Sequence, residues 1–527
     1  MLYGRLFDKL EFGGVWVWCT RVIGHCVQDI RTVLIFGPVL LYIFLNNDPR
    51  ERSFLMKKAS CLLLAILMSM ICFGCGQVAA PTQSQTTEPP LPPANLSAGF
   101  GRVDVTPDYS VPMAGYGNYT SRMSQDVRDP LYVTCIAVSN GAGTVLMYTI
   151  DVINVNAGSL PEEYRQAATD ATGISGDHIF MGGTHTHSSG GVCDAPAGRQ
   201  WKKDLLAAIA KAGQDAIADL SPCQMFQAKT NLKNMNFIRH YKVADGTYYG
   251  SNFGNPTPGL VGYVGEPDDQ MILLKFQRDG DKKDILFVNW QAHPDHSGET
   301  GHYTISSDFV GVLRQDLEKK QDVLVGYYGG ASGNLNPFTE IPADMTGLSM
   351  EQYGLKLSSL AADAMKLLTP VQGDTIATKV EPHTFTIDHS WDDRVEDAQI
   401  VVKVRDVLGK NSANAEGLKY GFSSVYHASA VVSRSKMGNS ETREQCAFRI
   451  GDVGFIEAKC EMFSGSALYI KENSPFETTV VICGNGTYIP TEDAYEIQAY
   501  EAVTSNFTKG CAEEMNEHFL QMLDSIK

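Results

Sequence analysis

Two patterns of apolar and polar positions alternate along the chain from about residue 97. Unbroken apolar runs of strand length predict buried β-strands, and apolar residues that recur three and four positions apart predict amphipathic helices. The predicted strands cover residues 144–152, the start of 178–187, 271–276, 284–294 and 322–330. The predicted helices begin at Ser159 with a capping box to Glu162, cover 200–220, run from Ser306 to about Lys320, and cover 349–368.

This alternation predicts an α/β fold: a layered mixed sheet with flanking helices in one large domain, residues 97–527. After residue 372 strand patterns become more frequent, and a long helix is predicted near 491–523. Ligands in such folds gather at the carboxyl ends of strands. Candidate chemistry is therefore sought where the predicted strands end.

The N-terminal residues have a different pattern, which is typical of an export signal. Met56 is followed by two lysines, and the apolar run that begins at Cys61 ends in Phe-Gly-Cys-Gly. Residues 56–75 resemble a bacterial lipoprotein signal with Cys75 as the lipidated first mature residue, although Cys72 stands where leucine is usual. A plain secretory signal or a membrane anchor is the alternative.

Residues 1–55 precede this signal, and their apolar run at 32–45 is short for a membrane span. We interpret residues 1–55 as an extension from a start codon assigned too early, or otherwise as an N-terminal anchor. Residues 76–96 are rich in Pro, Thr, Gln and Ala and predict an extended linker. The protein is therefore expected to be exported and held at the membrane by its N-terminal lipid.

The net charge narrows the classes of binding partner, and the cysteine spacing bears on disulfide bonds. The formal net charge is −17 over 527 residues, and a nucleic-acid partner is excluded because phosphate binding requires a basic face. Seven of the 12 cysteines follow Cys75, at irregular spacings that do not form a disulfide framework, although a disulfide or two remains open.

A glycine-rich segment carries the first candidate chemistry. In GGTHTHSSGG (182–191), His185 and His187 stand two positions apart and share one face of an extended segment. His293 also follows a predicted strand, and three histidines at two strand ends suit zinc. A catalytic zinc needs a further protein ligand, usually a carboxylate, and many carboxylates of the chain could supply it. His296 and His302 are expected to be solvated loop residues.

Several ordered motifs resemble the catalytic domain of the neutral/alkaline non-lysosomal ceramidases. The resemblance implies a zinc-dependent amidohydrolase that cleaves the N-acyl amide bond of ceramide or a related lipid. A zinc hydrolase of another amide or ester, and a non-catalytic surface binding lipoprotein, are the alternatives. The motifs cover about residues 97–510 and are GFGRVDVTP (99–107), MAGYGN (113–118), GTHTHSSGG (183–191), Trp-x-x-His-Pro (290–294), SSDFVG (306–311) and YIPTEDAYEIQAYEA (488–502).

The resemblance also implies roles for individual residues. His187 would be the general base, Arg239 would bind the substrate carbonyl or hydroxyl, and Tyr500 would stabilise the oxyanion. The plainer alternatives are helix packing for Tyr500 and a surface ion pair for Arg239. Asn336 would touch substrate, but Asn334 and Asn336 depart from the family's Gly-Asp-x-Ser-Pro motif, and an amide cannot act as a nucleophile. The implied zinc ligands are His185, His293, Glu461 and Tyr488.

Overall fold

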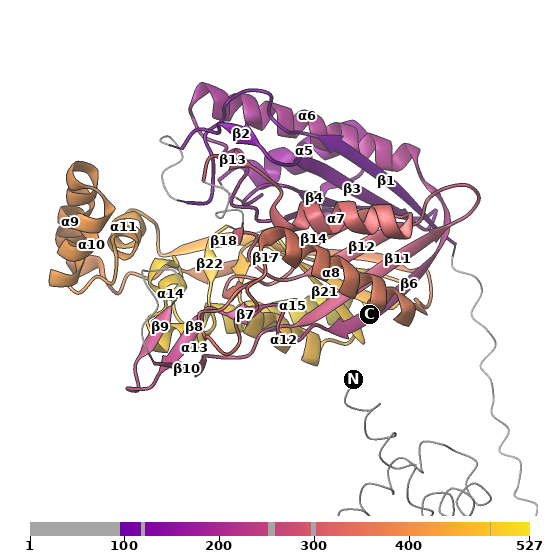
Figure 1. Cartoon of the computed structure of the whole chain (residues 1–527). Helices are drawn as coiled ribbons and strands as arrows, with labels where there is room; N and C mark the ends of the chain where they lie inside the picture. Colours follow the sequence, from indigo (N-terminus) through magenta and orange to yellow (C-terminus); the bar gives the residue numbers. More distant parts are fainter. Residues whose placement is uncertain (1–94, 117–121, 157, 251–258, 297–301, 485) are drawn as a thin grey trace, which may run out of the picture. The chain divides into compact units, whose positions relative to one another are not determined.

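A nine-stranded mixed sheet lies at the centre of the computed structural model, which describes residues 95–527 except 117–121, 157, 251–258, 297–301 and 485 (Figure 1). The strand order is β14-β12-β11-β6-β1-β3-β4-β5, with the short β16 paired to β6. The pairs β4–β5 and β12–β14 are parallel and the other neighbours are antiparallel. The strands are β1 Leu96–Asp104, β3 Tyr132–Ser139, β4 Thr144–Ile150, β5 Ile179–Gly183, β6 Ser221–Asn231, β11 Gln270–Arg278, β12 Ile285–Trp290, β14 Leu324–Gly329 and β16 Thr369–Pro370.

Helices cover one face of these strands. Helices α5 (Leu160–Thr172) and α6 (Pro196–Ala218) pack on β1, β3 and β4, and α7 (Asp308–Gln321) and α8 (Met350–Ala364) pack on β11, β12 and β14. Successive strand residues point to opposite faces, so apolar residues at alternate positions serve two cores. Tyr148 of β4, for example, faces the helices, whereas its neighbour Met147 faces away from them. The predicted layered mixed sheet with flanking helices is confirmed.

A second sheet covers the opposite face. It consists of β17 (Ile376–Thr386), β18 (Ser440–Ile450), β19 (Val453–Ala458) and β21 (Thr478–Cys483), in the order β17-β18-β19-β21. Stacked aromatic rings join the two sheets, since Phe180 of β5 lies over Phe448 of β18 with centroids 3.8 Å apart. Helices α12 (Ser464–Asn473) and α15 (Cys511–Ser525) cover the outer side of the second sheet.

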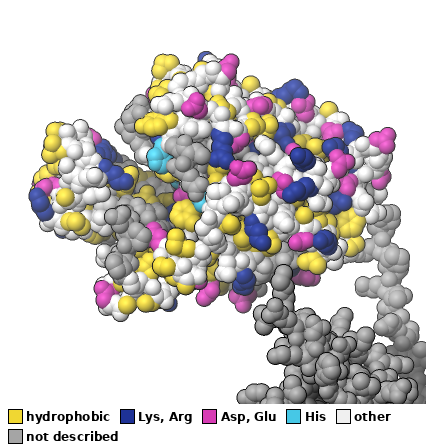
Figure 2. Space-filling model, viewed as in Figure 1, with side chains coloured by type: hydrophobic (Ala, Val, Ile, Leu, Met, Phe, Trp, Pro, Cys, Tyr) yellow, Lys and Arg dark blue, Asp and Glu magenta, His cyan; other side chains and the backbone are white. Residues whose placement is uncertain are grey.

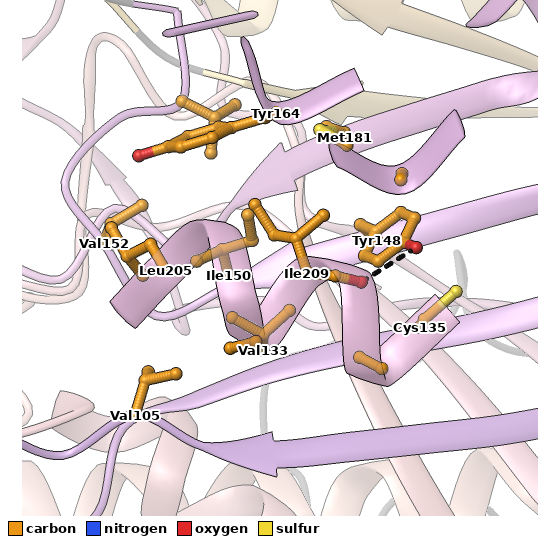
Figure 3. Close-up of a cluster of buried hydrophobic side chains, with 14 of the residues drawn as sticks. Val105, Val133, Cys135, Tyr148, Ile150, Val152, Tyr164, Met181, Leu205 and Ile209 are labelled. Carbon is orange, nitrogen blue, oxygen red and sulfur yellow. Dashed lines mark hydrogen bonds between the residues drawn. The ribbon is translucent and has the colours of Figure 1, made fainter. Parts of the chain in front are cut away.

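Two glycines allow α6 to lie directly on β1. A Cβ atom at Gly99 or at Gly101 would stand 2.0 Å from a carbonyl oxygen of α6, so no larger residue fits at either position. Beside this contact the Tyr148 hydroxyl donates a hydrogen bond of 3.1 Å to the carbonyl of Ile209 (Figure 3). The close helix–strand approach and the buried tyrosine together fix α6 against the sheet.

Some helix limits differ from the sequence-based predictions. Helix α6 begins at Pro196 rather than at residue 200, since proline is compatible with the first turn of a helix. The capping box predicted at Ser159 is absent from the described structure, because its hydroxyl instead donates a 2.6 Å hydrogen bond to the Glu163 carboxylate. Ser349 does form a capping box, with Gln352 at the start of α8.

The C-terminal half differs more from the prediction. The long helix expected over 491–523 is three helices, α13 (Glu492–Glu496), α14 (Tyr500–Thr504) and α15. Two residues with positive φ separate them, Gln498 at 51° and Gly510 at 95°. Three further helices, α9 (Val395–Leu408), α10 (Lys410–Lys419) and α11 (Val425–Arg434), interrupt the region where strands were expected and form a small core of their own (Figure 1).

Further predictions concern the N-terminal segments, the cysteines and the surface charge. The signal segment 56–75, the extension 1–55 and nearly all of the linker 76–96 lie outside the described residues. No helix in the described part of the chain is long and apolar enough to cross a membrane. The seven cysteines that follow Cys75 are free thiols in the structure. On the face in Figure 2, Lys and Arg side chains are scattered among acidic ones rather than gathered in one area.

Candidate metal centre

The end of β5 places the histidines of the THTH segment. Beyond Gly183 the chain turns, and His185 adopts a left-handed backbone with φ 67°. Its backbone N–H donates to the carbonyl of Val152, and its Nδ1 lies 2.5 Å from the carbonyl of Ile153. Two loop residues thus orient the His185 ring so that Nε2 points away from the strand.

His187 is held from the other side. Its backbone N–H donates to the carbonyl of Pro294, and a Cβ atom at Gly115 would stand 2.7 Å from the Cβ of His187. Only glycine permits this approach, and Gly115 also has a positive φ of 112°. Tyr116 packs its ring edge against the His187 ring at a centroid distance of 5.2 Å.

His293 comes from the loop after β12. Its backbone N–H donates to the carbonyl of Leu335, and its Nδ1 lies 2.8 Å from the carbonyl of Ser332. The loops after β5 and β12 meet because the two edges of the large sheet approach each other. A Cβ at Gly329 of β14 would lie 3.2 Å from the carbonyl oxygen of Gly183.

The three imidazoles converge on one point through their Nε2 atoms. The His185 and His293 Nε2 atoms are 3.1 Å apart, and those of His185 and His187 are 3.4 Å apart. A carbonyl oxygen beside Nδ1 of His185 and of His293 requires an N–H there, which leaves an Nε2 lone pair free to bind a metal. The two Nε2 atoms therefore face each other across the position that a metal ion would occupy.

Glu461 reaches this point, and Tyr488 lies beside it, on two very short paired strands. Strands β20 (Glu461–Met462) and β22 (Tyr488–Ile489) are parallel, with Glu461 paired to Tyr488. Glu461 Oε2 lies 3.3 Å from Nε2 of His185 and 3.6 Å from Nε2 of His293, and it has no hydrogen-bond partner among the described residues. A carboxylate oxygen thus completes a donor set of imidazoles and carboxylate that fits zinc.

Burial dominates the titration of these groups. It lowers the pKa of His187 and of His293 well below the usual value, and the nearby Arg239 charge adds to both shifts. Burial also opposes charge on His185, but the Glu461 carboxylate reverses the effect and raises the pKa of His185. Burial and then Glu461 raise the pKa of Tyr488 well above its usual value.

Arg239 lies beside the cluster in a fully buried ion-pair network. It stands between β7 (Phe237–Ile238) and β8 (His240–Val243), and only 3% of its surface is exposed. Its Nη2 donates to the Tyr488 hydroxyl at 3.2 Å, and its Nη1 lies 3.4 Å from Nε2 of His293. Its Nε donates to Glu501 Oε1 at 2.6 Å. The surface ion pair considered for Arg239 from the sequence is therefore wrong.

Glu501 anchors this network. Its second oxygen, Oε2, lies 2.7 Å from Nε2 of His240. Burial raises the pKa of Glu501, but Arg239 and His240 outweigh burial and bring the pKa down to about 2. Glu501 and His240 were not predicted from the sequence. Glu501 belongs to the motif at 488–502 and His240 follows Arg239, but neither position indicated that the two residues contact each other.

The last two predicted residues lie at the side of the cluster. Tyr500 begins α14, and its ring lies edge-on to Tyr488 and to Tyr426 at centroid distances of 5.9 and 6.1 Å. Asn336 is buried in β15 (Leu335–Asn336), where it pairs with Phe237 of β7, two positions before Arg239. The neighbouring carbonyl of Asn334 accepts the Arg239 backbone N–H.

The residues near His293 match the sequence-based expectation only in part. His296 is buried, with 8% exposure, and its ring packs near Phe338 and Tyr353, so the expectation of a solvated loop residue is wrong. His302 is exposed as expected. Asp295, which the sequence did not single out, is enclosed so that burial raises the pKa of its carboxyl to about 6.

The structure therefore brings the predicted residues into one region. His185, His187 and His293 are a group of residues that can hold a metal ion, with ligand atoms within 4.8 Å of one another. Glu461 touches two of them, and Arg239 links His293 to Tyr488. The His187 Nε2 atom lies 3.4 Å from that of His185, a position from which it could bind a metal or accept a proton beside one.

Comparisons with known proteins agree with this fold. No family model and no curated protein sequence matches the chain. The structure is similar to that of neutral ceramidase from Pseudomonas aeruginosa, with a TM-score of 0.58 and 16% identity, over 81% of this chain and 74% of that one. A ceramidase complexed with C2 matches with the same TM-score and coverage at 15% identity. The chain thus has the fold of the neutral ceramidases.

Proposed function

We propose that the protein is a zinc-dependent hydrolase of the neutral ceramidase type, which cleaves the N-acyl amide bond of ceramide or a related lipid. The observation that supports it most is the convergence of the His185 and His293 Nε2 atoms with a carboxylate oxygen of Glu461, beside the buried cation of Arg239. The ceramidase fold supports the same reaction class.

In this proposal His185, His293, Glu461 and Tyr488 hold the zinc. When bound, zinc would lower the pKa of a water molecule to about 7 and polarise the substrate carbonyl. The high pKa of Tyr488 does not prevent its use as a ligand, because a metal favours the deprotonated form of the groups that bind it. The Arg239 guanidinium, 3.2 Å from the Tyr488 oxygen, would further stabilise that negative charge.

The remaining residues would handle the proton and the developing charge. His187 is neutral because burial lowers its pKa, so its imidazole would accept the proton of the attacking water. Arg239 and Tyr500 would stabilise the oxyanion, and the Glu501 ion pair keeps the guanidinium in place. Asn336 would donate an amide hydrogen bond to substrate, and no serine nucleophile is needed at that position.

The pair Asn334 and Asn336 favours a second candidate, a zinc hydrolase of a different amide or ester. Asn334 has a structural task in this chain, since its Oδ1 accepts the Ser464 backbone N–H and its carbonyl accepts that of Arg239. Asn336 is then the single substrate-facing departure from the ceramidase motif, and its amide would change which headgroup fits. A non-catalytic binding lipoprotein is the third reading, and it would not require the metal.

The test is fatty-acid release from a fluorescent short-chain ceramide by the purified protein, with and without a chelator, together with the zinc content. Chelator-sensitive release with one zinc per chain is the expected result. A protein that holds one zinc but releases no fatty acid would favour another amide or ester. A protein with neither zinc nor release would overturn the hydrolase and favour a binding protein.

We also propose that the protein is exported and anchored through a lipid on Cys75. The signal pattern at 56–75 supports this proposal. Metabolic labelling with a radioactive fatty acid should label the wild-type protein and leave Cys75→Ala unlabelled. Equal labelling of the two proteins would contradict the anchor.

A further inference from the structure

An acidic cavity of about 540 Å³ lies on the side of the second sheet covered by α12 and α15. Five carboxylates line it, and no Lys, Arg or His is among the described residues that do so. None of the five forms an ion pair with a described residue elsewhere. The carboxylates are Glu266, Asp493, Glu513, Glu514 and Glu517.

Two residues that line this cavity each have a buried side-chain oxygen without a hydrogen-bond partner among the described residues. Asn516 is only 3% exposed, and its Oδ1 is one of these oxygens. The second is Oε2 of Glu513, whose other oxygen accepts the backbone N–H of Glu492. The two residues are three positions apart on α15 and so lie on the same face of that helix. A buried acceptor without a donor costs stability unless a ligand supplies the missing interaction.

The hydroxyl groups around the cavity do not supply the missing hydrogen bonds to Asn516 and Glu513. The Tyr469 hydroxyl donates to Glu517 Oε1 at 2.5 Å, and the Thr491 hydroxyl donates to Asp493 Oδ1 at 2.6 Å. The Ser464 hydroxyl donates to the carbonyl of Glu266 at 3.1 Å. With these donors engaged, the cavity offers mainly oxygen acceptors and negative charge to a ligand.

We propose that this cavity binds a divalent cation, with Ca²⁺ preferred to Mg²⁺. Ca²⁺ accepts six to eight oxygen ligands from carboxylates, amide carbonyls and water in flexible geometry, whereas Mg²⁺ demands a near-ideal octahedron. Glu513 and Asn516 supply the inner ligands, and Glu517 and Asp493 stand at the rim. The wide cavity leaves room for several waters, which suits the larger ion.

The proposed cation site is separate from the histidine cluster but shares a wall with it. Asn334 and Ser464 line the cavity, and the Ser464 N–H donates to Asn334 Oδ1 at 2.9 Å. Ser464 begins α12, three residues after Glu461. Bound Ca²⁺ should therefore stiffen the wall that carries Glu461. This cation site does not depend on the hydrolase proposal.

Calcium titration of the purified full-length protein by calorimetry tests the site. We expect one Ca²⁺ per chain with a Kd of about 10⁻⁴ to 10⁻³ M, the range of extracellular calcium modules, and a weaker response to Mg²⁺. Glu513→Gln and Asn516→Leu should each weaken Ca²⁺ binding at least about tenfold, because each removes an inner ligand. Circular dichroism of each variant shows whether it is folded.

Two controls make the result specific. Glu472→Gln changes the same charge on the exposed side of α12, away from the cavity, and should bind Ca²⁺ like the wild type. His185→Ala should also bind Ca²⁺ normally, so a failure of the zinc hypothesis does not affect this test. The proposal would be overturned if the protein bound no Ca²⁺, or if folded Glu513→Gln and Asn516→Leu bound Ca²⁺ as well as the wild type does. It would also be overturned if the protein bound the organic cation spermidine but not Ca²⁺.

Discussion

The Nε2 atoms of His185 and His293 lie 3.1 Å apart, although 108 positions separate the two residues in the chain. Each ring is oriented by a loop carbonyl at Nδ1, from Ile153 and from Ser332. Imidazoles held in this way present two lone pairs to one point, which is how proteins prepare histidines for a metal. This relationship underlies the first prediction below.

His185→Ala should abolish zinc binding and reduce hydrolysis to background, because the substitution removes one of two imidazoles that face each other across the metal position. Zinc content by atomic absorption and the ceramide assay would be measured together. His178→Ala is the matched control, since His178 lies at the other end of β5, partly exposed and away from the cluster. Full zinc content in the His185 variant would contradict the assignment.

His187→Ala should leave the zinc content unchanged and lower kcat by about 10²- to 10⁴-fold, the usual contribution of a general base. The base acts when neutral, and its pKa is lowered by burial. Wild-type activity should therefore stay level from pH 8 down to about 6.5, the ordinary histidine pKa, and fall only at more acidic pH. Loss of zinc from the His187 variant would instead identify His187 as a ligand.

Glu501→Gln should lower activity by about 10- to 100-fold, the usual cost of removing a partner that orients a site residue. It should also destabilise the protein by about 3 to 5 kcal/mol at pH 7, because it leaves Arg239 as a buried charge without its partner. Glu496→Gln, an exposed change on α13, is the control. Unchanged activity and stability would show that the ion pair does not hold Arg239.

The same ion pair predicts a pH dependence of stability. The pKa of Glu501 is depressed to about 2 in the folded state, from an ordinary value of 4.5. Its contribution is therefore fully present above pH 4.5 and is lost as the pH falls towards 2. Urea unfolding at pH 7 and pH 3 should show a smaller loss of stability for Glu501→Gln than for the wild type. An equal loss in both proteins would contradict this origin of the acid sensitivity.

Gly101→Ala should destabilise the fold by at least about 1 to 3 kcal/mol, the cost of overpacking a tight contact. The new Cβ would meet the carbonyl oxygen of Ala212 at 2.0 Å, so α6 would have to move off β1. Gly176→Ala, with open space around the new atom, should change stability by no more than about 0.5 kcal/mol. Urea denaturation of both variants measures the difference, and equal stability would contradict the close approach.

Local pattern alone predicted most of the central elements. The apolar runs at 144–152, 271–276 and 322–330 are strands β4, β11 and β14, because a buried strand must be apolar on both faces whatever surrounds it. The same pattern did not reveal where helices break. Gln498 ends the first of the C-terminal helices with a positive φ, and the Ala499 N–H closes the helix end onto the Ala494 carbonyl, although no glycine marks this position.

The residues of the candidate site were also predictable from the sequence only in part. His185 and His187 were evident from the sequence, since spacing and flanking glycines are local properties. His293 was also found from the pattern, since it follows a predicted strand. Glu461 and Tyr488 were suggested by family resemblance alone, because they stand on two-residue strands that pair with each other.

Tertiary structure decided the rest of the site and of the fold. Glu501 became a partner of Arg239, 262 positions away, only when burial removed water and made an unpaired guanidinium too costly. The sequence by itself determined which segments are strands and helices and which residues have metal-binding chemistry. Only folding decided which of those residues meet, because contacts across hundreds of positions depend on the packing of the two sheets and leave no periodic signal along the chain.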